Sequence, residues 1–293
     1  MKIAVSRSRK VFCVCNYILL SLIALLCLLP MWHVLCCSVS DPLSLARDKS
    51  LRLLPLFPLT FSGYESILKV DNIYIGYRNT LFYVSMSVIL NLILTSLAGY
   101  VLSRRRFMLR NIGMAFISFT MIFNGGLIPN YMLILNLGLL DSVWSIVLTS
   151  AFSAFNLVVM RTSMMQIPVE LEESAQLDGA NDLRILLSII LPVSKATVAV
   201  IALFVAVASW NSWFTASIFL SDHSKWPLQM FLREILVASN QRSIETGLKI
   251  SVLAEQNLIK YCTIIVATLP ILCIYPFVQK YFVKGVMIGS IKG

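Results

Sequence analysis

The densest group of chemically active side chains lies between residues 170 and 192, which read ELEESAQLDGANDLRILLSIILP. This segment places five carboxylates and one glycine within an otherwise apolar part of the chain. Carboxylates with no histidine or cysteine beside them are suited to ion pairs and hydrogen bonds with cationic groups. The segment therefore predicts a contact site for a basic partner.

Two short helices with a turn between them are the local structure that this segment predicts. Residues 169–177 have helical periodicity, and Gly179 can end that helix because glycine adopts the left-handed conformation at little cost. Asn181 or Asp182 can cap a second helix, which we expect to end at Pro192. An amphipathic helix lying on the membrane surface is the alternative. Acidic charge is unfavourable beside an anionic leaflet, so we favour a knob that docks into a basic protein groove.

The composition of the whole chain is that of a membrane protein. Hydrophobic residues make up 58% of the 293 residues, charged residues only 13%, and the mean hydropathy is +0.83. An average soluble domain has about 25% charged residues. Apolar runs of about 20 residues can cross a bilayer as helices, because a helix satisfies its own backbone hydrogen bonds.

Six such runs predict an all-α, polytopic fold with one membrane domain over residues 1–293. The predicted spans are residues 11–37, 79–103, 112–132, 143–160, 196–218 and 259–282. The first run is too long for a signal-peptide core and is followed by no small-x-small cleavage site, so we expect it to be retained. A loop of residues 161–195 then lies on one side of the membrane, and a loop of residues 219–258 lies on the other.

The positions of the basic residues predict the orientation of the chain, because cytoplasmic loops are enriched in Lys and Arg. With both termini in the cytoplasm, the cytoplasmic segments hold 14 of the 24 basic residues but only five of the 14 acidic ones. The net charge of +10 is therefore a topology signal that also favours contact with anionic lipid. We expect no nucleic-acid binding despite the pI of 9.4, since no basic patch is interleaved with aromatic residues.

Several kinds of chemistry lack the residues they need. His33 and His223 are the only histidines, so a His-dependent nucleophilic triad or a multi-His metal site has little material. The seven cysteines lie in or beside the spans, where a thiol packs as a small apolar group, and predict neither a disulfide framework nor a zinc site. The chain has no G-x-x-x-x-G-K-[ST] loop, so ATP would have to be bound by another chain. Almost no ionisable residue lies inside the spans, which disfavours an ion-coupled carrier.

The segment resembles a motif of the permease subunits of bacterial ABC importers. That motif has the form E-A-A, three residues, G, nine residues, I-x-L-P, and this chain matches it with Glu173-Ser174-Ala175, Gly179 and Ile189 to Pro192. Ser174 is the one departure, a small residue in place of another. Asp178-Gly179-Ala180 is similar to the carbohydrate-uptake branch, whose six-span, type I permeases the chain resembles over nearly its whole length.

The resemblance implies that residues 161–195 contain a coupling helix that docks into a cytoplasmic ATPase. Glu173 would face an Arg of the ATPase, and Gly179 would form the turn. The implied coupling residues are Glu173, Ser174, Ala175, Asp178, Gly179, Ala180, Leu191 and Pro192. The ending VKGVMIGSIKG is like a family tail that inserts between the two ATPases, which assigns this contact to Gly289, Lys292 and Gly293. A basic terminus attracted to anionic lipid is the alternative for the tail.

Substrate contacts are predicted in the sequence WNSWF near the outer end of the fifth span. Trp210, Trp213 or Phe214 could stack on a sugar face while Asn211 binds its hydroxyl groups. The alternative is that the two tryptophans are interface anchors. Basic residues such as Lys225 would suit acidic sugars, for example alginate fragments, or could simply balance neighbouring acids.

Two further segments are similar to the same importer branch. Residues 124–142 resemble the exit of the third span, where Gly125, Gly126 and Pro129 would allow a kink or close packing. The external loop, which contains Trp226-Pro227-Leu228-Gln229, would reach into the sugar cleft of a solute-binding protein.

The predicted function is therefore the translocation of a carbohydrate across the bacterial inner membrane by alternating access. The resemblance implies a second permease, two ATP-binding subunits that hold ATP and magnesium, and an external binding protein. This chain would be neither an enzyme nor a binder of cofactor or metal. An ATP-independent carrier or channel is one alternative, and a membrane anchor or receptor component without transport is another.

Overall fold

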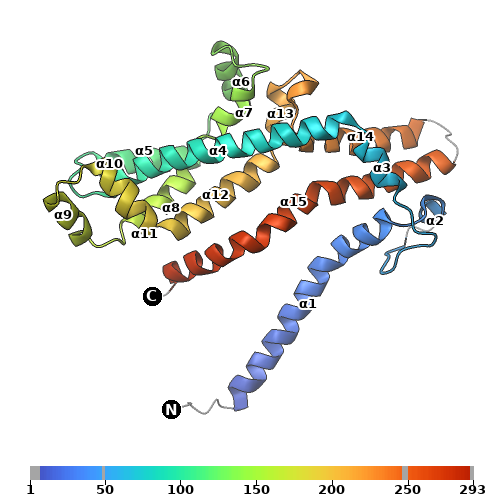
Figure 1. The fold of residues 1–293 in the computed structure, drawn as a ribbon, viewed down its shortest axis with the longest axis horizontal. Helices are drawn as coiled ribbons and strands as arrows, with labels where there is room; N and C mark the ends of the chain where they lie inside the picture. Colours follow the sequence, from blue (N-terminus) through green and yellow to red (C-terminus); the bar gives the residue numbers. More distant parts are fainter. Residues whose placement is uncertain (1–6, 48–49, 246–249, 291–293) are drawn as a thin grey trace. The chain divides into compact units, whose positions relative to one another are not determined.

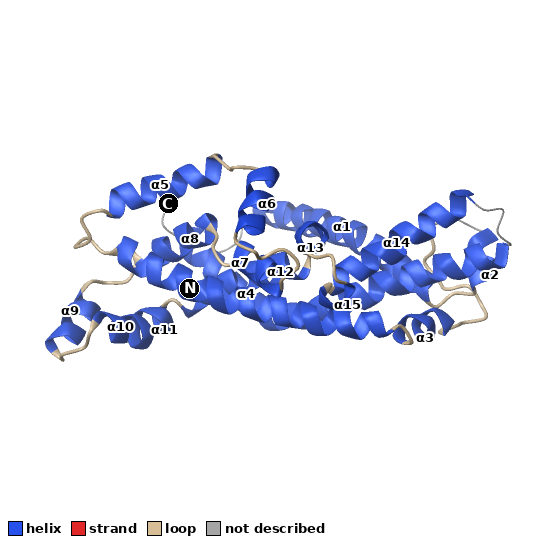
Figure 2. Cartoon of the chain, turned by 90° about the horizontal axis from the view of Figure 1, so that it is seen from above, coloured by secondary structure: helices blue, strands red, loops and turns tan. Residues whose placement is uncertain are grey.

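The computed structural model describes residues 7–47, 50–245 and 250–290, and within them the chain consists of helices joined by loops (Figures 1 and 2). The first helices are α1 (Arg7–Ser38), α2 (Pro42–Arg47), α3 (Ser62–Leu68), α4 (Asp71–Ser103), α5 (Arg110–Ile122), α6 (Leu127–Asn136), α7 (Val143–Thr149) and α8 (Ala154–Met164). They are followed by α9 (Glu170–Leu177), α10 (Asp182–Ile185), the π-helical turn η1 (Leu186–Ile190), α11 (Leu191–Val193), α12 (Lys195–Trp210), α13 (Trp213–Phe219), the 3₁₀ turn η2 (His223–Lys225), α14 (Leu228–Glu245) and α15 (Ile250–Ser290).

Two compact units make up the chain. The first contains residues 1–71 and 234–268, and the second contains residues 72–233 and 269–293. In the first unit, the Tyr64 hydroxyl donates to Ser38 Oγ over 2.7 Å, and the Cys262 thiol donates to the Ser38 carbonyl over 3.2 Å. Cys262 is buried and is a free thiol.

Three of the described helical segments are long and apolar enough to cross a membrane as single helices: Ser8–Ser38, Asp71–Ser103 and Ala254–Ile274. Three pairs reach that length only together, and each pair is bent. The bends are 113° between α5 and α6, 47° between α7 and α8, and 84° between Asp182–Val193 and Lys195–Trp210. Each bent pair counted as one span gives six spans, which agrees with an all-α, polytopic membrane protein.

The straight spans predicted at residues 112–132 and 143–160 are therefore each bent. The 84° bend lies before the span predicted at residues 196–218, which is interrupted instead at residues 211–212, between α12 and α13. The first break follows from Gly126, whose φ of 86° is left-handed, and from Asn124, whose Oδ1 accepts a hydrogen bond from the Gly126 amide over 3.0 Å. Pro129 lies in the first turn of α6, where a missing N–H costs little. A kink in this segment, one of the two predictions made for it, is confirmed at Gly126.

Helix α4 organises the second unit through a stripe of small and polar residues. Its buried residues include Gly76, Thr80, Ser87, Asn91, Thr95 and Gly99, which are spaced four or seven residues apart. This spacing puts them on one face, where small side chains let neighbouring helices approach closely. A Cβ on Gly99 would lie 3.0 Å from Met160 Cγ, so α8 packs directly on the α4 backbone.

Two clusters of buried apolar residues pack around α4. One joins Tyr100 of α4 to α8, α9, η1 and α12, and includes Met160, Ala175, Ile190 and Ile201. The other joins Tyr83 to α6, α7 and α13. The first cluster lies beside the C-terminal part of α4, where Figure 1 shows α9 to α11. Helix α4 therefore links two groups of helices within the same unit.

Candidate functional site

The acidic segment, residues 170–193, forms the two predicted helices. Helix α9 carries Glu170, Glu172 and Glu173 in its first turn, where carboxylates are stabilised by the positive end of the helix dipole. It begins at Glu170, two residues after Pro168.

Gly179 ends α9 in the way the sequence predicted. Its φ is 78°, its amide donates to the Gln176 carbonyl over 3.0 Å, and the Ala180 amide donates to the Ala175 carbonyl over 2.9 Å. These two bonds are the Schellman arrangement, which satisfies carbonyls that a helix end otherwise leaves without donors. A Cβ at Gly179 would meet no atom within 4 Å, so the conformation of the backbone, not crowding, favours glycine there.

The second helix begins as predicted but does not end at Pro192. Asn181 Oδ1 accepts from the Arg184 amide over 2.9 Å and caps α10. The chain then passes through the π turn η1 and continues through Pro192 to Val193. Pro192 has no N–H to donate to the carbonyl four residues earlier. The π turn just before it pairs residues five apart instead of four, so the hydrogen bonds next to the proline differ from those of a regular α-helix. The predicted end at Pro192 is therefore wrong by one residue.

The predicted coupling residues divide into exposed and packed positions. Glu173, Ser174, Asp178, Gly179 and Pro192 are exposed. Ala175 is buried in the cluster around Tyr100, and Ala180 and Leu191 pack partly against the same cluster. Leu177, which the sequence prediction did not include, is 90% exposed on α9 beside the turn. Beside the turn, the exposed surface of the segment therefore combines the Glu173 carboxylate with the Leu177 side chain.

Two ion pairs hold this segment to the C-terminal end of α4, and sequence reasoning missed both. Arg104 pairs with Glu172, and Arg106 pairs with Asp182. The Arg104 and Glu172 side chains are only 10% and 8% exposed, whereas the second pair is more than half exposed. Burial raises the pKa of Glu172, and Arg104 opposes that shift. Two of the five acids thus have ion-pair partners within the chain. Arg104 and Arg106, which are among the basic residues that predict the cytoplasmic side, also position α9 and α10.

A cavity of about 650 Å³ lies between α4, α7, α8, α12 and α13. Four phenylalanines line it: Phe152, Phe155, Phe204 and Phe214. Its polar lining residues are Asn91, Thr149, Ser150, Ser153, Asn156, Ser209, Asn211, Ser212 and Thr215. No charged side chain is among its described lining residues, so the cavity offers aromatic faces together with neutral hydrogen-bonding groups.

Both breaks in the neighbouring spans open onto this cavity. Ser150, Phe152 and Ser153 lie between α7 and α8, and Asn211 and Ser212 lie between α12 and α13. Backbone that leaves the helical conformation at membrane depth is tolerated where it lines a cavity, because polar groups there can find partners. The residues of the two breaks therefore form part of the cavity wall.

A ladder of hydrogen bonds fixes one wall of the cavity. Asn91 Nδ2 donates to the Ser150 carbonyl over 3.3 Å, Asn156 Nδ2 donates to Asn91 Oδ1 over 3.3 Å, and the Ser87 and Ser150 hydroxyls lie 2.6 Å apart. Ser209 lines the cavity at 3% exposure, and its hydroxyl has no partner among the described residues. A buried hydroxyl without a partner is available to a ligand.

The four predicted substrate residues fall in different places. Asn211 and Phe214 line the cavity. Trp210 is 5% exposed and lies 6.4 Å from the Tyr77 ring, between ring centroids, so in this chain it is a packed residue. Trp213 is outside the described lining, and the Arg233 guanidinium lies 3.9 Å from its ring centroid.

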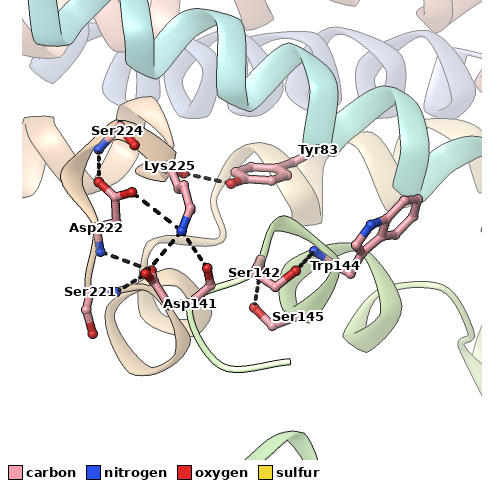
Figure 3. Close-up of polar contacts among 9 residues, drawn as sticks. All are labelled: Tyr83, Asp141, Ser142, Trp144, Ser145, Ser221, Asp222, Ser224 and Lys225. Atoms are coloured by element: carbon pink, nitrogen blue, oxygen red, sulfur yellow. Dashed lines mark hydrogen bonds and ion pairs between the residues drawn. The ribbon is translucent and has the colours of Figure 1, made fainter. Parts of the chain in front are cut away.

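A latch of charged groups joins the loop after α6 to the loop after α13 (Figure 3). Asp141 has a φ of 54°, and its Oδ1 accepts from the amides of Ser221 and Asp222 over 3.1 and 3.0 Å. Lys225 Nζ donates to the Asp141 carbonyl over 2.7 Å and to Asp141 Oδ2 over 3.1 Å, and lies 3.4 Å from Asp222 Oδ2. The Tyr83 hydroxyl donates to the Lys225 carbonyl over 2.7 Å, which ties the latch to α4.

The latch shifts the titration of its members. The Asp222 amide bond, followed by Lys225, lowers the pKa of Asp141, and the bond to Asp141 raises the pKa of Lys225. Of the two predictions for Lys225, the structure favours the balancing of neighbouring acids over sugar binding.

The predicted contact residues of the C-terminal tail are only partly described. Gly289 lies near the end of α15, whereas Lys292 and Gly293 lie outside the described residues.

A family model described as the binding-protein-dependent transport system inner membrane component matches residues 69–288. This range includes the acidic segment, the cavity and the latch. The chain belongs to this family of ABC importer permeases. The predicted resemblance and the all-α permease fold are thereby confirmed.

Individual relatives agree over nearly the whole length of this permease. It is 39% identical to the polygalacturonan/rhamnogalacturonan transport system permease protein YtcP of Bacillus subtilis, over 97% of this chain and 99% of that protein. It is 27% identical to the maltodextrin transport system permease protein MdxG of the same organism, over 98% and 99%. A solved structure of a bacterial ABC transporter involved in the import of the acidic polysaccharide alginate matches with a TM-score of 0.84 and 31% identity, over 96% of this chain and 100% of that one.

Proposed function

We propose that this permease is the transmembrane subunit of an ATP-driven importer that carries an oligosaccharide through the 650 Å³ cavity. The lining of the cavity carries the proposal: four phenylalanine rings and nine neutral polar residues, in walls formed partly by broken spans. Sugar rings present C–H faces to aromatic rings and hydroxyl groups to amides and hydroxyls. A volume of this size is within the range of about 300–1,000 Å³ for small-molecule sites.

An acidic oligosaccharide is the substrate class that we propose. YtcP and the alginate transporter, two of the similar proteins, are named for acidic polysaccharides. The described lining of the cavity is uncharged, so it would bind the rings and hydroxyl groups of the sugar. Recognition of the carboxylates would then come from the second permease or from the binding protein.

The proposed complex contains this chain, a second permease, two ATP-binding subunits and an external solute-binding protein, in the inner membrane with both termini of this chain in the cytoplasm. The ATP-binding subunits would hold ATP and magnesium, and this chain would bind no cofactor. Glu173 and Leu177 would dock onto an ATP-binding subunit. The buried Arg104–Glu172 pair would pass the motion of α9 to α4, whose Asn91 lines the cavity. The C-terminal tail, including Gly289, would contact the same subunits.

Uptake into proteoliposomes that contain the whole complex tests this function. Labelled oligogalacturonate and maltodextrin are supplied with the binding protein, and ATP is supplied to the ATP-binding subunits. We expect ATP-dependent uptake that favours the acidic sugar. Uptake that needs no ATP would refute the importer assignment, and a preference for maltodextrin would refute only the acidic class.

Two variants separate the roles of the segment and the cavity. Glu173→Lys inverts the docking charge, so both ATPase attachment and uptake should fall. Phe214→Ala removes a cavity wall and should lower uptake at least tenfold while the ATP-binding subunits stay attached. Phe116→Ala is the matched control, because Phe116 is 69% exposed on α5 and outside the described lining. Equal uptake by Phe214→Ala and Phe116→Ala would show that the cavity is not the pathway.

A further inference from the structure

A groove in the second unit runs between α4 and the helices that follow the turn at Gly179. It consists of two adjoining hollows of about 560 and 710 Å³, which share Leu97 of α4, Leu183 of α10 and Leu186 of η1 as walls. The groove is separate from the substrate cavity, with which it shares no described lining residue.

The end of the groove nearest the C-terminus of α4 is polar and basic. Arg104, Arg106 and Asp182 line it together with Tyr100. The Tyr100 side chain is 5% exposed, and its hydroxyl has no hydrogen-bond partner among the described residues. Most buried polar groups have a partner, so this hydroxyl marks a position where a hydrogen-bond acceptor belongs.

The two arginines keep donors for such an acceptor. Arg104 pairs with Glu172 and Arg106 pairs with Asp182, but a guanidinium has five N–H donors and neither pair can use them all. Guanidinium groups bind phosphate strongly because several N–H donors match its oxygens.

The other end of the groove is apolar apart from Ser96 and one cation, Lys195. Leu92 and Ile93 of α4 face Leu187 and Leu191 across it, and Lys195 lies at its edge. The described lining of the whole groove thus holds three cations and one carboxylate. A basic, donor-rich end that continues into an apolar channel matches an anionic headgroup with its acyl chain.

We propose that this groove binds one anionic phospholipid of the inner leaflet. The phosphate accepts a hydrogen bond from the Tyr100 hydroxyl and lies beside Arg104 and Arg106, and an acyl chain follows the apolar walls past Leu97 and Leu187. One wall of the groove is formed by α10 and η1, which follow α9 within the acidic segment. A bound lipid therefore stabilises that segment against α4.

Native mass spectrometry of the detergent-purified whole complex tests the site. Delipidated complex is titrated with phosphatidylglycerol or with phosphatidylcholine of the same acyl chains, and tightly bound lipid is counted. Tyr100→Phe removes only the donor, and a lost hydrogen bond to a charged group corresponds to about tenfold weaker retention of phosphatidylglycerol. Arg105→Gln is the matched control, since Arg105 is exposed and lines neither hollow. Equal retention of the two lipids, or equal retention by Tyr100→Phe and wild type, would overturn the proposal.

A photocrosslinking residue at Leu187 identifies what occupies the groove in the membrane. Leu187 is 56% exposed in this chain and lines the apolar hollow. Crosslinks to phospholipid, enriched for phosphatidylglycerol, are expected. A crosslink to the second permease instead would show that a protein helix covers the groove and would overturn the lipid site. Neither measurement depends on transport, so a failure of this proposal is distinct from a failure of the importer assignment.

Discussion

Removal of one partner from the buried Arg104–Glu172 pair should destabilise this permease strongly. Arg104→Gln leaves the Glu172 carboxylate in a site where the two side chains are only 10% and 8% exposed. Loss of one member of a buried ion pair costs about 3–5 kcal/mol, because the remaining charge has no counterion. At pH 8 we therefore expect the free energy of unfolding to fall by about 3 kcal/mol.

The pH dependence of this loss has a definite sign. Burial raises the pKa of Glu172 above its ordinary value, and Arg104 opposes that shift, so in Arg104→Gln the folded state binds a proton more readily than the unfolded state. The free energy of unfolding then increases as the pH falls from the folded-state pKa of Glu172 towards its ordinary value of 4.5. The increase is at most about 1.4 kcal/mol per pH unit. The defect of the variant should therefore shrink in acid.

Unfolding in mixed detergent and SDS micelles, followed at several pH values, measures these differences. Arg105→Gln is the control, and an exposed substitution of this kind should change stability by less than about 0.5 kcal/mol. The double variant Arg104→Gln/Glu172→Gln should lose less stability than the sum of the two single variants, because neither charge is then left alone. Equal stability of the Arg104 and Arg105 variants, or a defect that grows as the pH falls, would refute the reasoning.

Two further substitutions test the turn and the latch. Gly179→Ala should cost about 1–2 kcal/mol from its φ of 78° alone, whereas Gly125→Ala, which has ordinary contact distances, should cost less in the same unfolding assay. Equal losses would mean that the left-handed turn is not responsible. Lys225→Met should speed amide hydrogen exchange at Ser221 and Asp222, since both amides donate to the Asp141 carboxylate that Lys225 holds. In wild type the pKa of Asp141 is lowered from 3.8 and that of Lys225 is raised from 10.5, so the latch persists between these two ordinary values. Protection of these amides relative to their intrinsic exchange rate that changes within that range, or that the variant leaves unaltered, would contradict this account.

Local rules were sufficient for the acidic segment. Gly179 and Asn181 act within a few residues of themselves, so their turn and cap follow from residue type and spacing. The two ion pairs to α4 did not follow, because the partners are separated by about 70 residues in the chain. Nothing in the local sequence distinguished Glu172, which is buried, from Glu173, which is exposed.

The cavity shows the limit of hydropathy more clearly. Apolar runs predicted which parts of the chain enter the membrane, because transfer of apolar side chains depends on composition. Hydropathy does not register a break of a few residues, so residues 150–153 and 211–212 were assigned to continuous spans. The same breaks bring Asn211 and Phe214 to the cavity while Trp210 packs against Tyr77.

The sequence by itself determined the membrane class, the six apolar segments and the glycine turn of the acidic segment, since each depends on composition or on neighbours in the chain. Only the tertiary structure decided which polar residues share a cavity, which acids pair with the arginines that follow α4, and that the buried Tyr100 hydroxyl has no partner among the described residues. Those features depend on where bent helices meet, and a bend of a few residues moves every side chain beyond it.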